Sequence, residues 1–360
     1  MRAGPGQVLA GRYRLIDRPG APSAFAVDER SGEVVRLRAW ELPARLTVGQ
    51  EDDAEPVRGE RLVRRVAEVG AAAPRHPRLL QGAGAFVEGD LLRTVEEGPA
   101  GRPLAEVLAD GPLPPYRAAE VAADLAAALR ALHDVGLAHG NLTADSVLVC
   151  EDGAALLGGL LPGVAEEVLA EELGGPGGRR RYEVRAELVG PVAERWPLDG
   201  GPAGDCWALG VLLHRMATGR APYPESGVPE LVTAVREGRR VPSEACGPLG
   251  PLVERLVQPD PARRPTAAEI RLELAELLAG APEPTAGERA VLPVPEPRRP
   301  AARRGAARRG GAAGAERSRV EAAGPARPPR IPPAMLGPVL VGGVFLLLVL
   351  GVVAVVLFAG

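Results

Sequence analysis

The chain has 360 residues, which is enough for one large domain or two modest ones with additional segments. All 43 of its basic residues are arginine, so no site in it can use a lysine amine as a tunable base or nucleophile. Residues 281–330 hold eleven Arg and five Glu, whereas residues 1–280 are acidic. Cys150, Cys206 and Cys246 form no Cys/His ligand cluster, so we expect neither a metal site nor a disulfide.

The N-terminal part of the chain has the pattern of β-strands. Residues 12–45 contain the apolar or alternating stretches "RYRLI", "AFAVDE" and "VVRLRAW", with "RSGE" as a turn between the last two. Residues 79–97 predict two strands joined at Gly89–Asp90, which is a typical hairpin signal. Between these segments, the Arg- and Glu-rich residues 55–70 predict a helix.

The pattern then becomes helical. Residues 117–136 have apolar side chains at helical spacing: Val121, Leu125, Leu129 and Leu132. Residues 204–219 predict a strongly apolar helix, and residues 266–280 predict another that begins at a Thr N-cap. The sequence therefore predicts an α+β fold, with a small β-rich lobe at about 11–97 and a larger helical lobe at about 102–280.

The C-terminal part divides into two segments. Residues 281–334 are rich in Pro, Ala, Gly and Arg, and they cannot bury enough apolar surface to fold, so we expect a disordered linker. Residues 335–360 carry no charge, and Val339–Phe358 is a run of about 20 apolar residues, enough to cross a bilayer core as a helix. A buried core helix is the alternative, but the run is apolar on every face. We therefore predict a single transmembrane helix at 335–360.

The arginines of the linker allow three interpretations. By the positive-inside rule they place the folded part in the cytoplasm, which makes the chain a single-pass protein of the cell membrane. They could also bind anionic lipid headgroups, each Arg contributing on the order of 1 kcal/mol near the surface. Nucleic-acid binding is not expected, because the linker lacks interleaved aromatic residues for stacking.

Four motifs, in the same order and at similar separations, resemble the bacterial eukaryotic-type (Hanks-type) Ser/Thr protein kinases over residues 11–280. "LAGRYRLI" resembles the opening strand, and "ADGPLPPYRAAEVAADLAAALRALHDVGLAHGNLTADSVLV" resembles the stretch that leads into the catalytic loop. "GDCWALGVLLHRMATGRAPYP" resembles the D-x-W-x-L-G helix, and "DPARRPTAAE" resembles the closing D-P-x-x-R-P-T motif. The resemblance implies a bilobal kinase-like fold.

The resemblance also gives structural roles to four residues. His139 is the first residue of the H-R-D motif, and Asp205 would accept hydrogen bonds from backbone amides of the catalytic loop. Glu194 aligns with the Glu of the A-P-E motif and Arg264 with its ion-pair partner, a pair that is costly to break once buried. These residues support the fold and not catalysis.

The catalytic groups that the resemblance requires are replaced. Asn141 stands for the Asp that accepts the substrate hydrogen, and Thr143 stands for the Lys that stabilises the transferring phosphoryl group. Ser146 stands for the Asn that binds magnesium, and the D-F-G Asp aligns with Gly158 or Gly159. We therefore expect no intact catalytic residue and no magnesium site.

Residues that would contact ATP are altered as well. The turn "RPGAPSA" keeps only Gly20 of the Gly-rich loop, and its prolines remove backbone donors. Arg38 aligns with the phosphate-binding Lys, and its helix partner could be Glu60 or Glu68, between which the sequence does not decide. Asp145 could replace a lost metal ligand, but a solvated loop acid or a helix cap is the simpler interpretation.

Two functional hypotheses follow. The first is a membrane-anchored pseudokinase that binds a cytoplasmic signalling or cell-envelope protein as a scaffold and requires no cofactor. The second is an active, atypical ATP-dependent Ser/Thr kinase that uses Asp145 and Arg38. ATP binding stays open in both, because adenine recognition in this family depends largely on backbone and apolar groups. The first is favoured by the combined losses and by the absence of Ser and Thr between Val147 and Ala217, where such kinases are switched by phosphorylation.

Overall fold

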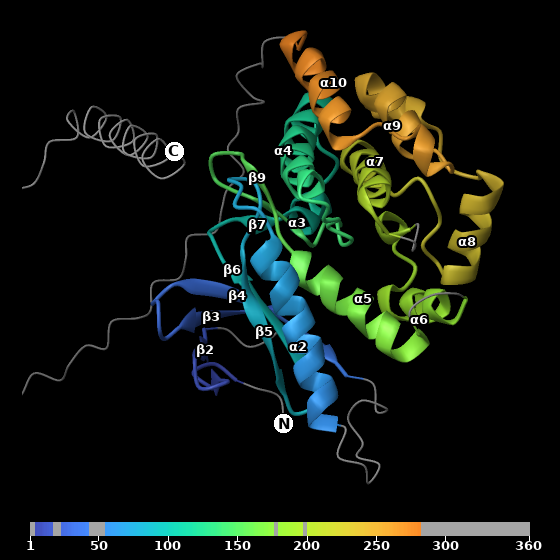
Figure 1. Cartoon of the computed structure of the whole chain (residues 1–360). Helices are drawn as coiled ribbons and strands as arrows, with labels where there is room; N and C mark the ends of the chain where they lie inside the picture. Colours follow the sequence, from blue (N-terminus) through green and yellow to red (C-terminus); the bar gives the residue numbers. More distant parts are fainter. Residues whose placement is uncertain (1–3, 17–22, 43–54, 176–178, 197–199, 282–360) are drawn as a thin grey trace, which may run out of the picture. The chain divides into compact units, whose positions relative to one another are not determined.

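The computed structural model describes residues 4–16, 23–42, 55–175, 179–196 and 200–281. All of them belong to the first of two compact units, Met1–Arg298, and the second unit, Arg299–Gly360, lies outside the described residues. Within the first unit, an N-terminal β-sheet with one long helix is followed by a helical region (Figure 1). The predicted order, a small β-rich lobe before a larger helical lobe, is confirmed.

The N-terminal lobe is built on an antiparallel six-stranded sheet in the order β1-β2-β3-β4-β6-β5. Its strands are β1 (Val8–Leu9), β2 (Tyr13–Leu15), β3 (Ser23–Asp28), β4 (Val34–Glu41), β5 (Gly82–Glu88) and β6 (Leu91–Glu97). Successive side chains of a strand point to opposite faces. Val35 and Leu37 of β4 therefore enter one apolar cluster with Tyr13, while Arg36 and Arg38 lie on the other face.

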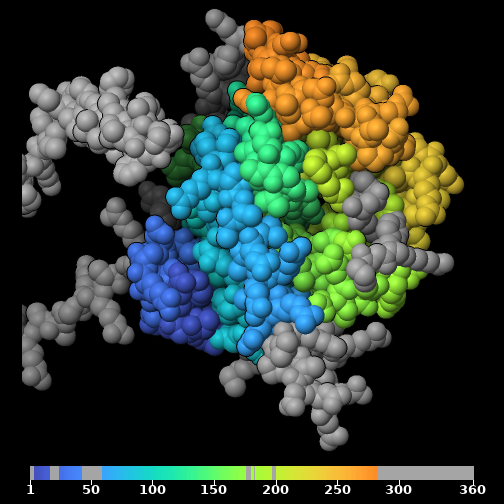
Figure 2. Space-filling model, viewed as in Figure 1, coloured from blue at the N-terminus to red at the C-terminus, as the bar shows by residue number. Residues whose placement is uncertain are grey.

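Helix α2 (Glu55–Ala72) is formed by the Arg- and Glu-rich segment that predicted a helix, and it packs against β5. Leu62 and Val66, one turn apart, enter an apolar cluster with Leu92 of the sheet and with Leu161 and Leu169 of a later helix, α5 (Leu160–Gly174). In the space-filling view, the light-blue surface of α2 lies beside the yellow-green surface of α5 and α6 (Arg179–Val189) (Figure 2). Helix α5 thus connects the two lobes.

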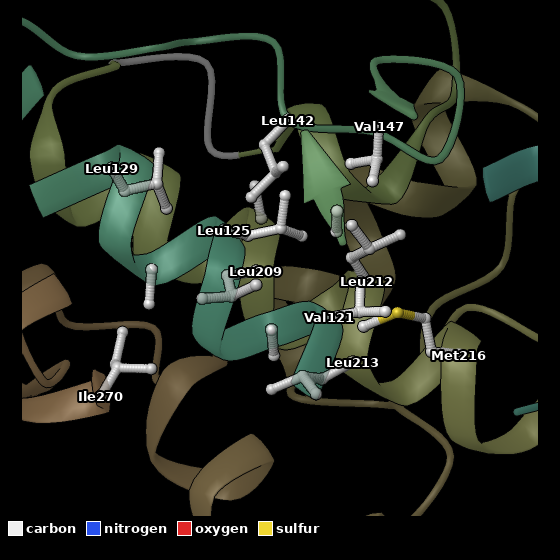
Figure 3. Packing of buried hydrophobic residues seen from close by; sticks show 14 of the residues in the cluster. Val121, Leu125, Leu129, Leu142, Val147, Leu209, Leu212, Leu213, Met216 and Ile270 are labelled. Atoms are coloured by element: carbon white, nitrogen blue, oxygen red, sulfur yellow. The ribbon is translucent and has the colours of Figure 1, made fainter. Parts of the chain in front are cut away.

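The helical lobe is organised around two long helices, α4 (Pro115–Asp134) and α7 (Pro202–Thr218). Their buried side chains pack with Ile270 of α10 (Ala267–Ala279) in the core shown in Figure 3. The remaining elements are short: β7 (Arg102–Pro103), α3 (Leu104–Ala109), β8 (Val147–Val149), β9 (Ala155–Leu157), η1 (Ala193–Arg195), α8 (Val228–Glu237), η2 (Ser243–Leu249), α9 (Gly250–Leu256) and η3 (Pro261–Arg263). The three helices predicted for this lobe correspond to α4, α7 and α10, and α10 begins with the expected Thr266 cap.

Several predictions concern residues beyond the described ranges. The disordered linker, apart from Ala281, and the transmembrane helix at 335–360 lie outside them. Among the helices of the described part, none combines the length and the apolar character needed to cross a bilayer. Helices α5 and α6 were not predicted, and in α5 Pro162 and Gly163 of the first turn interrupt the helical signal.

Candidate functional site

The segment that aligns with the catalytic loop follows α4 in the chain and is hydrogen-bonded to α7. The buried carboxylate of Asp205 accepts hydrogen bonds from the backbone N–H groups of His139 and Gly140, both at 2.8 Å. It also lies 2.9 Å from Nε2 of His133, a partner that the sequence reasoning missed. The contact expected of Asp205 with this loop is therefore present in the structure.

His139 links this loop to the glycines that align with the D-F-G motif. Its ring is buried, and Nε2 lies 3.1 Å from the carbonyl oxygen of Gly158. Burial lowers the pKa of the His139 imidazole below its ordinary value. A neutral ring fits both contacts, because Nε2–H can donate to Gly158 while Nδ1 accepts from the backbone N–H of Asn141 at 3.3 Å.

Asn141, at the position of the catalytic base, is enclosed by the protein. Its side chain is 0% exposed, and Nδ2 donates a hydrogen bond to the carbonyl oxygen of Gly159 at 2.9 Å. A Cβ placed on Gly163 of α5 would lie 2.8 Å from Cβ of Asn141, so the backbone of α5 packs directly on this residue. The amide is therefore neither basic nor accessible to a substrate hydroxyl.

Thr143 and Ser146 bind each other rather than a ligand. The hydroxyl of Ser146 donates to the carbonyl oxygen of Thr143 and accepts from its backbone N–H, each at 2.9 Å. Both residues are buried. The position that would bind magnesium is thus used to close the loop, and the position of the phosphoryl-stabilising Lys carries no charge.

A side chain at either of the two glycines at the D-F-G position would require its neighbours to move. A Cβ on Gly158 would lie 2.7 Å from Nη2 of Arg36 and 2.8 Å from Cδ1 of Leu80. Gly159 has φ +85°, and a Cβ there would lie 3.0 Å from Nδ2 of Asn141. In the described part of the chain, no group of three or more His, Cys, Asp or Glu could hold a metal ion.

Arg38 is turned toward the catalytic loop and not toward the helix. Its Nη2 donates to the backbone carbonyl oxygen of Asp145 at 2.8 Å, and burial lowers the pKa of its guanidinium. Neither helix candidate pairs with it: Glu60 and Glu68 of α2 are exposed, and Glu68 lies 3.6 Å from Arg65. The predicted helix partner is therefore wrong for both residues, because the face of α2 that carries them is the solvated one.

Asp145 and Gly20 complete the predicted nucleotide site. The side chain of Asp145 is exposed, and its backbone carbonyl is the group that contacts Arg38. Gly20 lies outside the described residues.

A buried ion pair that sequence reasoning missed lies beside Arg38. Nε of Arg36 donates to Oε1 of Glu96 at 2.7 Å, and Nη2 of Arg36 makes a second bond to the same oxygen. The other oxygen of Glu96 accepts from the backbone N–H of Gly159 at 2.7 Å. The signal was available in principle, because β4 carries Arg at two alternating positions and β6 ends in two Glu.

The pairing expected between Glu194 and Arg264 is wrong. Arg215 of α7 donates two hydrogen bonds, of 2.5 and 3.0 Å, to the buried carboxylate of Glu194. Arg264 donates instead to the backbone carbonyl oxygens of Gln258 and Ala203, at 2.8 and 2.9 Å, among other contacts. Arg215 reaches Glu194 because α7 packs against η1, which carries the Glu.

A second charge pair is buried on α5. Nη1 of Arg195 donates to Oε1 of Glu166 at 2.9 Å, and the Glu166 side chain is almost fully enclosed. Burial raises the pKa of Glu166, and the positive charge of Arg195 opposes that shift. The pair joins α5 to η1. Helix α5, which follows Gly159, therefore contacts both the loop at Asn141 and η1.

Comparison with known proteins identifies the family. No protein-family model matches the chain. The chain is 28% identical over 273 residues to the Ser/Thr protein kinase PkaA of Streptomyces coelicolor, covering 69% of this chain and 49% of PkaA. It is 27% identical over 288 residues to the Ser/Thr protein kinase pkn2 of Myxococcus xanthus, covering 76% and 33%.

A plant relative gives the same result. The chain is 30% identical over 274 residues to CBL-interacting protein kinase 25 of Oryza sativa subsp. japonica, covering 73% of this chain and 47% of the relative. The chain thus spans half the length or less of these curated relatives. With a β-rich lobe, a helical lobe and Asp205 bound to the loop at His139, the chain belongs to the protein kinase family, and its relatives there are Ser/Thr kinases.

Proposed function

We propose that this chain is a pseudokinase: a kinase-like domain that binds a protein partner and transfers little or no phosphate. The observation that carries the proposal is the environment of Asn141. Its amide is fully buried and donates to the carbonyl oxygen of Gly159, beneath the backbone of α5 at Gly163. A group that is neutral, enclosed and already bonded cannot remove a proton from a substrate.

The surrounding positions support the same conclusion. Catalysis of phosphoryl transfer depends mainly on positioned metal ions and on charges that neutralise the transferring group. Ser146 is bonded to Thr143, and a carboxylate at position 158 or 159 would require neighbouring side chains to move. Arg38 is bonded to a protein carbonyl. Each loss removes a different contribution, and the described residues contain no group of three or more His, Cys, Asp or Glu that could hold a metal ion instead.

An active, atypical kinase is the alternative, and one contact favours it. Arg38 reaches the backbone of Asp145, which brings a cation and an exposed carboxylate to the same edge of the loop. In such an enzyme Asp145 would act as the metal ligand, and Asp145→Ala would abolish activity. The alternative requires the pair to replace the base, both metal ligands and the charge lost at Thr143.

We also propose where the module acts. The uncharged residues 335–360 would anchor it in the cell membrane, with the arginines of 281–334 on the cytoplasmic side, where they could contact anionic lipids. Its partner would be a cytoplasmic signalling or cell-envelope protein. The acidic balance of residues 1–280 favours a partner with a basic surface.

The test is a phosphotransfer assay on the full-length chain with labelled ATP, magnesium or manganese, and a basic protein as acceptor. We expect no label above that of a heat-denatured sample, either on the chain or on the acceptor. Incorporation that disappears in Asp145→Ala would overturn the proposal in favour of the atypical kinase. Glu151→Ala, which removes another exposed carboxylate after β8, is the matched control.

A further inference from the structure

The face of the sheet that is turned toward the catalytic loop is lined with buried polar side chains. The strand register pairs Arg36 with Glu96 and Arg38 with Thr94 across β4 and β6. All four are at most 8% exposed. Buried charges are uncommon unless they are paired, so we expect the charged side chains on this face to bond to protein groups and not to water.

Two of these residues form charged hydrogen bonds from one lobe to the other. Arg38 donates to the carbonyl oxygen of Asp145 at 2.8 Å, and Glu96 accepts from the backbone N–H of Gly159 at 2.7 Å. Hydrogen bonds with one charged partner are stronger than neutral ones, and more so where water is excluded. The sheet is thus bonded directly to the loop segments of the helical lobe.

The guanidinium of Arg36 lies against Glu96 and Gly158. It holds Glu96 through two bonds, and its Nη2 lies where a side chain on Gly158 would have to stand, 2.7 Å from an ideal Cβ. Access to the cleft would require this pair to separate. That would leave the Glu96 carboxylate buried without its cation.

Helix α5 closes the same space with apolar contacts. The buried side chain of Leu161 packs against a glycine in each of two neighbouring elements, β5 and α2. A Cβ on Gly82 of β5 would lie 2.5 Å from Cδ1 of Leu161, and a Cβ on Gly70 of α2 would lie 3.0 Å from its Cδ2. The helix can approach α2 and β5 this closely only because those positions have no side chain. Leu161 directly follows the Gly159–Leu160 step, so the bonded loop and the packed helix are continuous.

We propose that the chain's own side chains close the cleft between the lobes: Arg36, Arg38 and Glu96 form the bridge, and Leu161 of α5 secures it. The inference rests on the proposed function and deepens it, since a domain closed in this way presents a fixed surface to its partner without nucleotide. The atypical-kinase alternative requires the opposite, an opening that admits ATP.

The first test is thermal unfolding of the full-length chain with millimolar ATP, in the presence and in the absence of magnesium. We expect the same unfolding temperature in all samples. A ligand that binds only the folded state raises this temperature, so a reproducible ATP-dependent increase would overturn the inference.

The second test is hydrogen exchange followed by mass spectrometry. Arg38→Met removes the bond to Asp145 while keeping an unbranched side chain, and we expect exchange of the loop amides in residues 139–149 to increase several-fold. Arg14→Met on β2 removes an exposed Arg from the same sheet and is the matched control. If Arg38→Met does not fold, Glu96→Gln serves instead, with the increase expected around Gly159. Equal exchange in the variant and the control would overturn the bridge.

The two proposals fail in different ways. Label transfer from ATP would overturn the pseudokinase function and the closed cleft together. Stabilisation by ATP without any transfer would overturn the closed cleft and leave the pseudokinase function in place. Absence of both, with faster exchange in Arg38→Met, would support both proposals.

Discussion

Nδ2 of Asn141 donates to the carbonyl oxygen of Gly159 at 2.9 Å, an arrangement that an aspartate at the same position could not form. The ionised carboxylate has acceptors only, so it would place a negative oxygen against a carbonyl oxygen. The amide of Asn141 therefore makes one bond here that an aspartate at this position could not make.

This relationship predicts the effect of restoring the aspartate. Asn141→Asp should lower the free energy of unfolding by about 3 kcal/mol, because it buries a carboxylate without a donor. It should produce no phosphate transfer. Denaturant unfolding and the labelled-ATP assay measure the two outcomes. Asp145→Asn, an exposed change on the same loop, should stay within about 0.5 kcal/mol. Activity in Asn141→Asp at unchanged stability would contradict this account of the site.

The packing of α5 on the loop gives a second prediction. Gly163→Ala should destabilise the chain by about 1–3 kcal/mol, because its Cβ would lie 2.8 Å from both Cβ of Asn141 and the carbonyl oxygen of His139. Gly204→Ala, on α7, is the matched control, since nothing lies within 4 Å of its added Cβ. That change should stabilise the chain by about 0.4–1 kcal/mol. Denaturation midpoints of the two variants should therefore move in opposite directions.

The buried pair at the cleft gives a third prediction. Arg36→Met should cost about 3–5 kcal/mol, because the Glu96 carboxylate stays buried without its cation. Arg14→Met removes one partner of an exposed pair with Glu29 and should cost less than about 1 kcal/mol.

The double variant Arg36→Met, Glu96→Leu should recover much of that loss, because no charge is then left unpaired. Unfolding free energies of the wild type, both single variants and the double variant measure this recovery. Strictly additive losses would contradict the pairing.

Some of this architecture could be predicted from the sequence, and the reasons for the rest are physical. The sequence predicts helix α4 from its periodic apolar face. It predicts α10 from Thr266, which forms a capping box with Glu269. Helix α5 is not predicted in this way: its apolar side chains and its four glutamates do not separate onto two faces, and it contains Pro162, so neither period nor capping marks it. One of its partners, α2, is distant in sequence.

The charge pairs were missed for a different reason. An Arg has many acids within reach along a chain rich in both, and only the fold selects between them. Glu194 aligned with a family pairing to Arg264, but Arg215 lies closer once α7 packs on η1. Arg36 and Glu96 stand opposite each other only through the β4–β6 register. The replacements at the aligned catalytic positions, in contrast, depend on residue identity alone and were visible from the motifs.

The last prediction concerns acid stability of the N-terminal lobe. Asp28 of β3 accepts two hydrogen bonds from Arg12, at 2.8 and 2.6 Å, and one from the backbone N–H of Arg30 at 3.0 Å. The hydrogen bond with Arg12 lowers the pKa of Asp28 from 3.8 to about 2. The folded chain therefore holds this proton less tightly than the unfolded chain, so the stabilisation is complete above the unfolded pKa and is lost as the pH falls through the folded one.

Asp28→Asn should thus be less stable than the wild type at neutral pH, and the difference in unfolding free energy should shrink between about pH 4 and about pH 2. Urea unfolding at a series of pH values measures it. Glu29→Gln, the exposed carboxylate next along the chain, controls for the general effect of lost negative charge. If the difference in unfolding free energy stayed constant down to about pH 2, the charge of Asp28 beside Arg12 would not be the source of the stabilisation. The loss in Asp28→Asn would then come from altered packing and hydrogen-bond geometry.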